Sequence, residues 1–133
     1  MDIQKKVLLV EDELLIQIPE KSMLKSKGFD VTVANTGALA IDLAGKDVYD
    51  LIFMDLGLPD IDGIEVTKKI RKNARENLHK PSVIIALTAP PFKERGELCQ
   101  ATGMNAYIQK PLSINKIDRI LQSGDFNTFN EIA

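Results

Sequence analysis

Five short apolar runs recur along this 133-residue chain, and longer amphipathic stretches separate them. Several runs are apolar at consecutive positions, which is typical of parallel strands buried on both faces. The runs cover residues 7–10, 31–34, 51–54, 83–87 and 106–108. Strands that alternate with helices pair in parallel through right-handed crossovers. The pattern therefore predicts an α/β fold: a (βα)5 doubly wound sandwich with a five-stranded parallel sheet.

The stretches between the runs have the apolar spacing of helices that cover a sheet. Apolar side chains recur every three or four residues at Ala38, Ile41, Ala44 and Val48, at Val66, Ile70 and Ala74, and at Ile114, Ile117 and Leu121. Ser113 is a suitable N-cap for the last helix. Three glycines fall where helices should stop, namely Gly28, Gly45 and Gly103.

The first helix is expected over residues 14–27 and contains Pro19. A proline inside a helix removes one backbone hydrogen bond, at a cost of roughly 3 kcal/mol if unrelieved. We therefore expect either a kink at Pro19 or a helix that starts later than Leu14. The polar residues 124–133 are interpreted as a C-terminal tail or a truncated linker, after a single domain at residues 1–123.

Composition excludes several classes of function. The net charge is −2, from 17 basic and 19 acidic residues, so there is no electrostatic case for a nucleic-acid partner. No apolar stretch approaches the roughly 20 residues that span a bilayer, and the N-terminus lacks a secretory apolar region. The single cysteine, Cys99, excludes an internal disulfide and fits a reducing compartment. We expect a cytoplasmic domain without membrane contact.

Acidic residues follow two of the apolar runs directly. Glu11 and Asp12 end the first run, and Asp55 ends the third. Ligands of open α/β sheets bind beyond the carboxyl ends of the strands, so these three carboxylates should converge there. Like charges that lie close together need a cation, and Mg²⁺ prefers oxygen ligands. Asp12, Asp55 and the Gly57 carbonyl can ligate Mg²⁺, while Glu11 can ligate directly or hold a bound water.

Phosphoryl transfer is the chemistry that this arrangement predicts. Aspartate forms acyl phosphates in covalent catalysis, and Asp55 lies between the other acids and the side of Thr88 and Lys110. The transfer needs in-line positioning and charge neutralisation, which the metal and Lys110 would supply. The Thr88 hydroxyl can donate to a phosphoryl oxygen. A cis bond between Lys110 and Pro111 would fix the direction of the lysine.

From residue 5 to residue 122 the chain resembles the receiver (response-regulator) domain of two-component signalling, which has a flavodoxin-like fold. Four segments carry the resemblance: LVED (9–12), MDLGLPDIDG (54–63), ALTA (86–89) and QKPL (109–112). The resemblance implies a set of roles: Asp55 as phosphoacceptor, Glu11 and Asp12 as the acidic pocket, Asp12, Asp55 and the Gly57 carbonyl as metal ligands, Thr88 as switch hydroxyl, Lys110 as the phosphate-pairing lysine and Tyr107 as switch aromatic. Such a domain catalyses its own phosphorylation and dephosphorylation but is not a turnover enzyme.

A finer resemblance concerns receivers inside hybrid sensor histidine kinases. It rests on VANTG (33–37), LTA (87–89) and ATGMNAY (101–107). It implies a bacterial phosphorelay, with a sensor histidine kinase or a histidine phosphotransfer domain as partner, and a domain that is a monomer or a weak dimer. The location could then be the cytoplasmic part of a membrane-bound kinase.

Three alternatives remain open. The chain could be a stand-alone response regulator, a receiver that serves only as an interaction module, or an aspartyl-phosphate phosphohydrolase. The intact set of acids, hydroxyl and lysine disfavours a pure interaction module. Phosphohydrolases of that kind carry a second aspartate two residues after the nucleophile, where this chain has Gly57. No phosphate-cradling glycine-rich turn follows the first run, which disfavours nucleotide binding.

Overall fold

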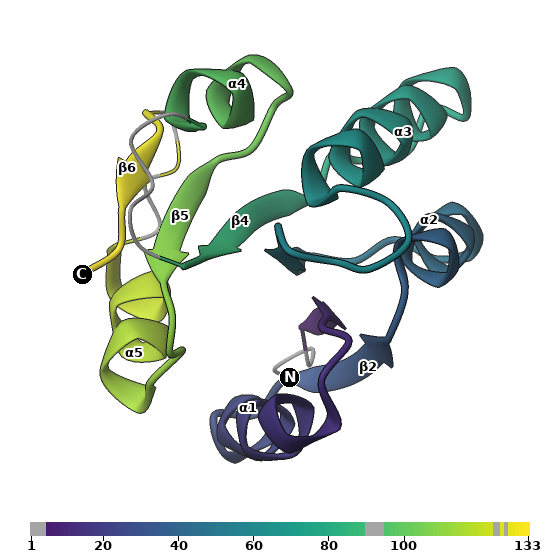
Figure 1. Ribbon diagram of the computed structural model, residues 1–133. Coiled ribbons are helices and arrows are strands. Elements are labelled where there is room, and N and C mark those ends of the chain that lie inside the picture. Colours follow the sequence, from purple (N-terminus) through teal and green to yellow (C-terminus); the bar gives the residue numbers. More distant parts are fainter. Residues whose placement is uncertain (1–4, 90–94, 124–125, 127) are drawn as a thin grey trace.

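The computed structural model describes residues 5–89, 95–123, 126 and 128–133 (Figure 1). Its strands are β1 (Lys6–Val10), β2 (Asp30–Ala34), β3 (Leu51–Asp55), β4 (Val83–Thr88), β5 (Ala106–Gln109) and β6 (Asn130–Glu131). Its helices are α1 (Leu14–Ser26), α2 (Gly37–Lys46), α3 (Gly63–Glu76), α4 (Gly96–Ala101) and α5 (Ile114–Ser123). Each predicted apolar run forms a strand, and a helix follows each of these five strands.

The strands form one parallel sheet in the order β2-β1-β3-β4-β5-β6. The prediction of five strands is therefore wrong by one. The additional strand, β6, comes from the segment that was expected to be a tail. Its two residues are polar and exposed, so no apolar run in the sequence predicts this strand. Its partner β5, not its own composition, makes it a strand.

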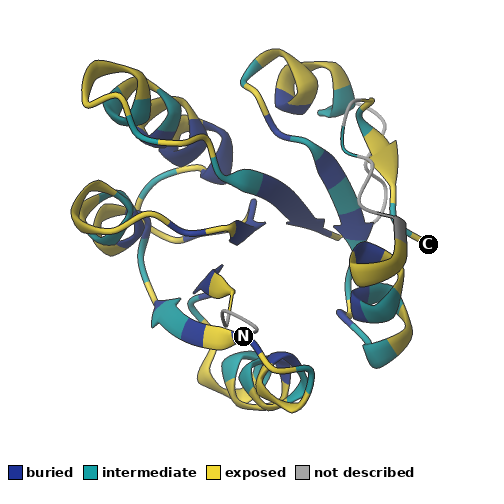
Figure 2. Ribbon diagram, turned by 180° about the vertical axis from the view of Figure 1, so that it is seen from behind, coloured by how far each residue is buried: buried dark blue, intermediate teal, exposed yellow. Residues whose placement is uncertain are grey.

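Helices cover both faces of the sheet (Figure 1). On one face, Leu24 of α1 and Ile117 of α5 pack on Leu9 and Phe53 of the strands. On the other face, the helices α2, α3 and α4 contribute side chains to a second core cluster. Figure 2 shows buried residues concentrated along the central strands and on the inner sides of the helices. The central strands β1, β3 and β4 are thus buried on both faces, as their unbroken hydrophobicity predicts.

Most of the predicted helix boundaries are confirmed. Gly28 and Gly103 follow the ends of α1 and α4 with φ of +91° and +94°, where a side chain would be strained. The Ser113 hydroxyl accepts a hydrogen bond of 3.3 Å from the Lys116 amide, which is the expected N-cap contact. The prediction for Gly45 is wrong, because α2 continues through it to Lys46. A Cβ at Gly45 would meet no atom within 4 Å, so neither packing nor backbone geometry stops the helix there.

Helix α1 starts at Leu14 and continues past Pro19, so the expected later start is wrong. The first turn forms without help from the proline. The amides of Ile16 and Gln17 both donate to the Glu13 carbonyl, at 3.1 and 2.9 Å. Pro19 itself is exposed, away from the core. In the described part of the chain, no helix is long and apolar enough to cross a membrane.

Candidate functional site

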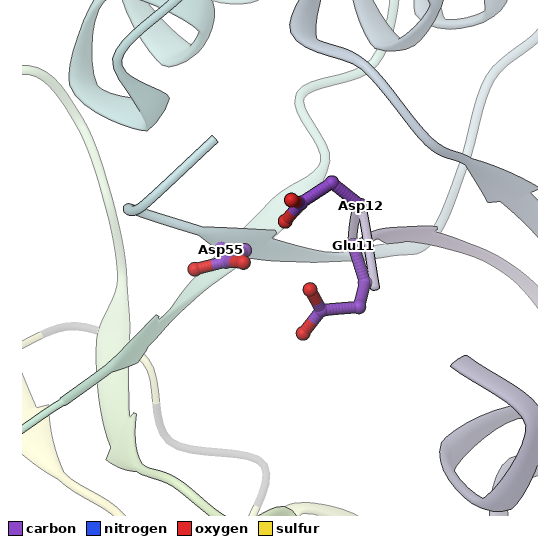
Figure 3. Close-up of side chains that lie close together, drawn as sticks. All are labelled: Glu11, Asp12 and Asp55. Carbon is purple, nitrogen blue, oxygen red and sulfur yellow. The ribbon is translucent and has the colours of Figure 1, made fainter. Parts of the chain in front are cut away.

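Three carboxylates converge at the carboxyl edge of the sheet (Figure 3). Glu11 and Asp12 follow β1, and Asp55 is the last residue of the neighbouring strand β3. One carboxylate oxygen from each lies within 4.8 Å of the others. The predicted convergence is confirmed, because parallel pairing of β1 with β3 brings both strand ends to the same place. Such an oxygen donor set fits a hard divalent cation.

Two of these acids are buried, and one lysine faces them. Asp55 is 3% exposed and Glu11 is fully buried. Lys110 Nζ lies 3.0 Å from Asp55 Oδ1 and 3.5 Å from Glu11 Oε1. Lys110 follows β5, and its bond to Pro111 is cis. A single ammonium cannot balance three carboxylates, so the site retains an excess of negative charge that favours a bound cation.

Burial and mutual repulsion shape the protonation of the site. Burial, the hydrogen bond to Asp55 and repulsion from its charge together raise the pKa of Glu11 to about 7. Burial also opposes the charge on Lys110, but its hydrogen bonds and attraction to Asp55 and Glu11 outweigh that effect and raise the pKa of the lysine. Lys110 therefore carries a positive charge at neutral pH, and the carboxyl group of Glu11 titrates in the neutral range.

The loop after Asp55 holds the carboxylate in place. The Gly57 amide donates to Asp55 Oδ1 at 2.9 Å. At Gly63, the first residue of α3, an added Cβ would lie 2.5 Å from the Asp55 carbonyl oxygen. Only glycine lets α3 begin this close to the Asp55 backbone. The Gly57 carbonyl remains a predicted metal ligand, and what is observed at Gly57 is its amide bond to Asp55.

Thr88 and Tyr107 lie on the same face of the sheet. Strand β4 ends at Thr88, which is 3% exposed, and Thr88 Oγ1 donates to the Ile108 carbonyl at 3.4 Å. Tyr107 pairs with Ala86, two residues before Thr88, so both side chains project toward the α4 side. The Tyr107 ring stacks on Phe129, with ring centroids 5.5 Å apart.

A cleft of about 240 Å³ opens above the carboxylates. Its lining includes Asp12, Asp55, Gly57, Thr88 and Lys110. The structure therefore brings together five of the predicted site residues around one space. Glu11 lies beneath the cleft, buried against Lys110, and Tyr107 lies outside its lining.

Arg95 is a charged residue of the cleft that sequence reasoning missed. It immediately precedes α4, and its Nη2 lies 2.6 Å from Asp62 Oδ1. Asp62 in turn caps α3 by accepting from the Ile64 amide at 2.8 Å. Arg95 and Asp62 are 33 residues apart, and no periodicity or motif links them. Only the approach of α4 to the start of α3 makes the pair.

The chain belongs to the response regulator receiver domain family, whose sequence profile matches residues 7–122. It is 36% identical over 121 residues to hybrid signal transduction histidine kinase B of Dictyostelium discoideum, which covers 85% of this chain and 6% of that protein. It is 35% identical over 119 residues to the polar-differentiation response regulator DivK of Brucella ovis, covering 90% and 94% of the two chains. The chain thus spans only a small part of the hybrid-kinase relatives.

Solved structures agree with this assignment. The receiver domain of sensor histidine kinase PA1611 from Pseudomonas aeruginosa, with a magnesium ion coordinated in its active site cleft, is 38% identical and superposes with a TM-score of 0.77, covering 90% of this chain and 96% of that one. The receiver domain of Saccharomyces cerevisiae Ssk1, in complex with the histidine phosphotransfer protein Ypd1, is 30% identical with a TM-score of 0.80, covering 87% and 85%. Because relatives occur in bacteria and eukaryotes, the bacterial origin stays a prediction.

Proposed function

We propose that this domain accepts a phosphoryl group from a phosphohistidine onto Asp55, as one step of a two-component phosphorelay. The observation that carries the proposal is the site itself. Asp55 is a buried carboxylate at a strand end, within 4.8 Å of two further acids and 3.0 Å from the Lys110 ammonium. A purely structural ion pair would not need three acids around one lysine. The cleft above Asp55 gives a phosphoryl group access.

Mg²⁺ is the cofactor that we propose for this step. Asp12, Asp55 and the Gly57 carbonyl would hold it, and Glu11 would orient one of its waters. The bound ion supplies positive charge that neutralises phosphoryl oxygens during transfer. The proposal is supported by the carboxylate donor set and by the receiver domain of PA1611, which has magnesium in the corresponding cleft.

The covalent change is an exchange of one bond to phosphorus. An Asp55 carboxylate oxygen forms the new P–O bond while the P–N bond of the donor's phosphohistidine breaks, and that bond's electron pair stays on the imidazole nitrogen. Lys110 faces the nucleophile and neutralises developing charge on the phosphoryl oxygens. Thr88 lines the same cleft and can donate its hydroxyl to a phosphoryl oxygen, at the expense of its 3.4 Å bond to Ile108.

The signal would follow from this rearrangement. A phosphoryl group adds a charge of about −1.5 to −2, which needs local hydrogen-bond donors. When Thr88 turns toward it, space opens on the α4 side of the sheet, and Tyr107 can turn inward to fill that space. The result is a shift between two populated states of one fold that alters the surface formed by α4, β5 and α5.

The exposed start of α1 is the surface that we propose for docking of the phosphodonor. Leu14, Leu15 and Ile18 are 64%, 86% and 59% exposed, and they lie within six residues of Asp12 in the chain. Large apolar side chains gathered on one surface mark interaction sites. A histidine phosphotransfer domain, the partner seen with the Ssk1 receiver, is the class of donor that we propose.

Two parent proteins are candidates. We propose a receiver from a hybrid sensor kinase, supported by the similarity to hybrid signal transduction histidine kinase B. A stand-alone response regulator is the second candidate, supported by the 35% identity to the polar-differentiation response regulator DivK. For either one we propose a cytoplasmic location, which the free thiol of buried Cys99 supports.

The experiment is phosphoryl labelling with acetyl phosphate, followed by intact mass spectrometry and peptide mapping. We expect the wild-type chain to gain one phosphoryl group in the presence of Mg²⁺, and Asp55→Asn to gain none. Asp42→Asn, a control on the exposed face of α2, should label like the wild type. Labelling of Asp55→Asn at the wild-type level would reject Asp55 as the acceptor.

A further inference from the structure

The chain returns to its own sheet after α5. Residues 128–133, named here the C-terminal strap, contain β6, which pairs in parallel with β5 (Figure 1). Asn130 lies opposite Ala106, and Glu131 lies opposite Tyr107. The Ile132 amide then donates to the Tyr107 carbonyl at 2.8 Å. The strap therefore covers the edge of β5 that would otherwise present unpaired backbone groups.

Side chains of the strap contact both faces of the sheet. Phe129 packs against the core on the side of α2, α3 and α4, whereas Ile132 packs against the core on the side of α1 and α5. Contacts on both faces hold a two-residue strand that backbone pairing alone would leave marginal. The strap is thus built from a short backbone ladder and two apolar anchors.

Tyr107 is the centre of these contacts. Its ring stacks on Phe129 with a centroid distance of 5.5 Å and an interplanar angle of 28°. Burial, the charge of Glu131 and a hydrogen bond to it raise the pKa of the Tyr107 hydroxyl. Ring, hydroxyl and backbone of Tyr107 therefore all contact the strap. An inward turn of this side chain would break the ring stack and the bond to Glu131.

We propose that the C-terminal strap is an intramolecular regulatory element that holds Tyr107 in its outward position and opposes the phosphorylated state. This inference rests on the proposed function, because it assumes that phosphorylation of Asp55 turns Tyr107 inward. Coupling between two sites is reciprocal. Phosphorylation therefore loosens the strap and frees the edge of β5, and loosening the strap favours phosphorylation.

The energy of the stack between Phe129 and Tyr107 determines how much a substitution at Phe129 should change the affinity for a phosphoryl analogue. An aromatic pair contributes enough beyond its buried area to change an equilibrium about two- to tenfold. That contribution exists only in the outward state, so Phe129→Ala should raise the affinity for a phosphoryl analogue by this factor. Phe129→Leu keeps apolar volume but lacks the ring, so it should give a smaller increase in the same direction.

The experiment uses the full chain with Mg²⁺ and beryllium fluoride, an analogue of the aspartyl phosphoryl group. NMR would follow amide exchange of Ile132, whose N–H bonds to Tyr107, and titration would give the affinity for beryllium fluoride. We expect Ile132 to exchange at least about threefold faster once beryllium fluoride binds. Thr128→Ala is the matched control, because Thr128 is an exposed residue of the same segment, and it should bind like the wild type.

The outcomes separate the two proposals. Binding of beryllium fluoride with unchanged Ile132 exchange, or with equal affinity in wild type, Phe129→Ala and Phe129→Leu, would overturn the strap and leave the proposed function standing. No binding by the wild type, together with no phosphoryl labelling of Asp55, would overturn both.

Discussion

At the scale of single residues, the most unusual group outside the site is Glu20 on α1. It is 3% exposed, and its Oε1 has no hydrogen-bond partner within the described residues. Burial raises the pKa of Glu20 to about 7, with Lys110 acting against that rise and Asp55 adding to it. Burial favours the protonated form of a carboxyl group, since burying its charge would cost more. Glu20 therefore makes the stability of the fold sensitive to pH.

The sign of that dependence follows from proton binding. The folded state holds the Glu20 proton more tightly than the unfolded chain does. The contribution of this proton to the free energy of unfolding is therefore complete below about pH 4.5 and is lost as the pH rises through about 7. We expect the wild type to lose about 1–3 kcal/mol more of its free energy of unfolding than Glu20→Gln between pH 4.5 and 8. Urea unfolding of both proteins at each pH measures this difference in the free energy of unfolding. Parallel pH profiles for the two proteins would contradict this interpretation.

At the scale of elements, α1 has two apolar surfaces, one buried in the core and one exposed. Its inner side places Leu24 in the core. Its first turns leave Leu14, Leu15 and Ile18 exposed beside the acids that follow β1. Apolar side chains that stay exposed contribute little to folding, and their gathering next to the cleft supports the proposed docking of a phosphodonor there. The same helix thus supports the sheet and carries the surface that we propose for docking.

A charged residue in that surface tests the docking. Leu15→Arg should lower phosphotransfer from a phosphorylated histidine phosphotransfer domain at least about tenfold, because central apolar contacts dominate such interfaces. Labelling by acetyl phosphate should be unchanged, since that small donor needs no protein surface. Leu78→Arg is the control, as Leu78 is 93% exposed in the loop after α3. Equal loss with both donors would point to a damaged site instead of a lost interface.

At the scale of the whole molecule, the sheet brings together negatively charged side chains from separate strands, and the nearby positive charge does not neutralise all of them. Glu11, Asp12 and Asp55 come together only when β1 and β3 pair, so their repulsion opposes folding. A divalent cation that binds the folded state alone reverses this effect and stabilises the fold by mass action. Metal binding and stability are therefore linked.

Thermal unfolding measures this linkage. With Mg²⁺ at about 100 times its dissociation constant, the wild type should gain about 2.7 kcal/mol, or roughly 10 °C in Tm. Asp12→Asn should be more stable than the wild type without Mg²⁺, since repulsion falls, and should lose most of the gain on adding it. Asp42→Asn should respond like the wild type. A full Mg²⁺ response in Asp12→Asn would remove Asp12 from the set of metal ligands.

The amino-acid sequence alone was enough to predict the five βα units. It was also enough to predict that five side chains lie close together at the carboxyl edge of the sheet, namely Glu11, Asp12, Asp55, Thr88 and Lys110. Both depend on local signals: unbroken apolar runs make buried strands, and parallel pairing brings the residues after each strand to the same side. Only the tertiary structure decided the sixth strand, the pair of Arg95 with Asp62, and the stack of Phe129 on Tyr107. These depend on contacts between segments that are distant in the chain and carry no periodicity of their own, so their energy exists only after the sheet and its helices have assembled.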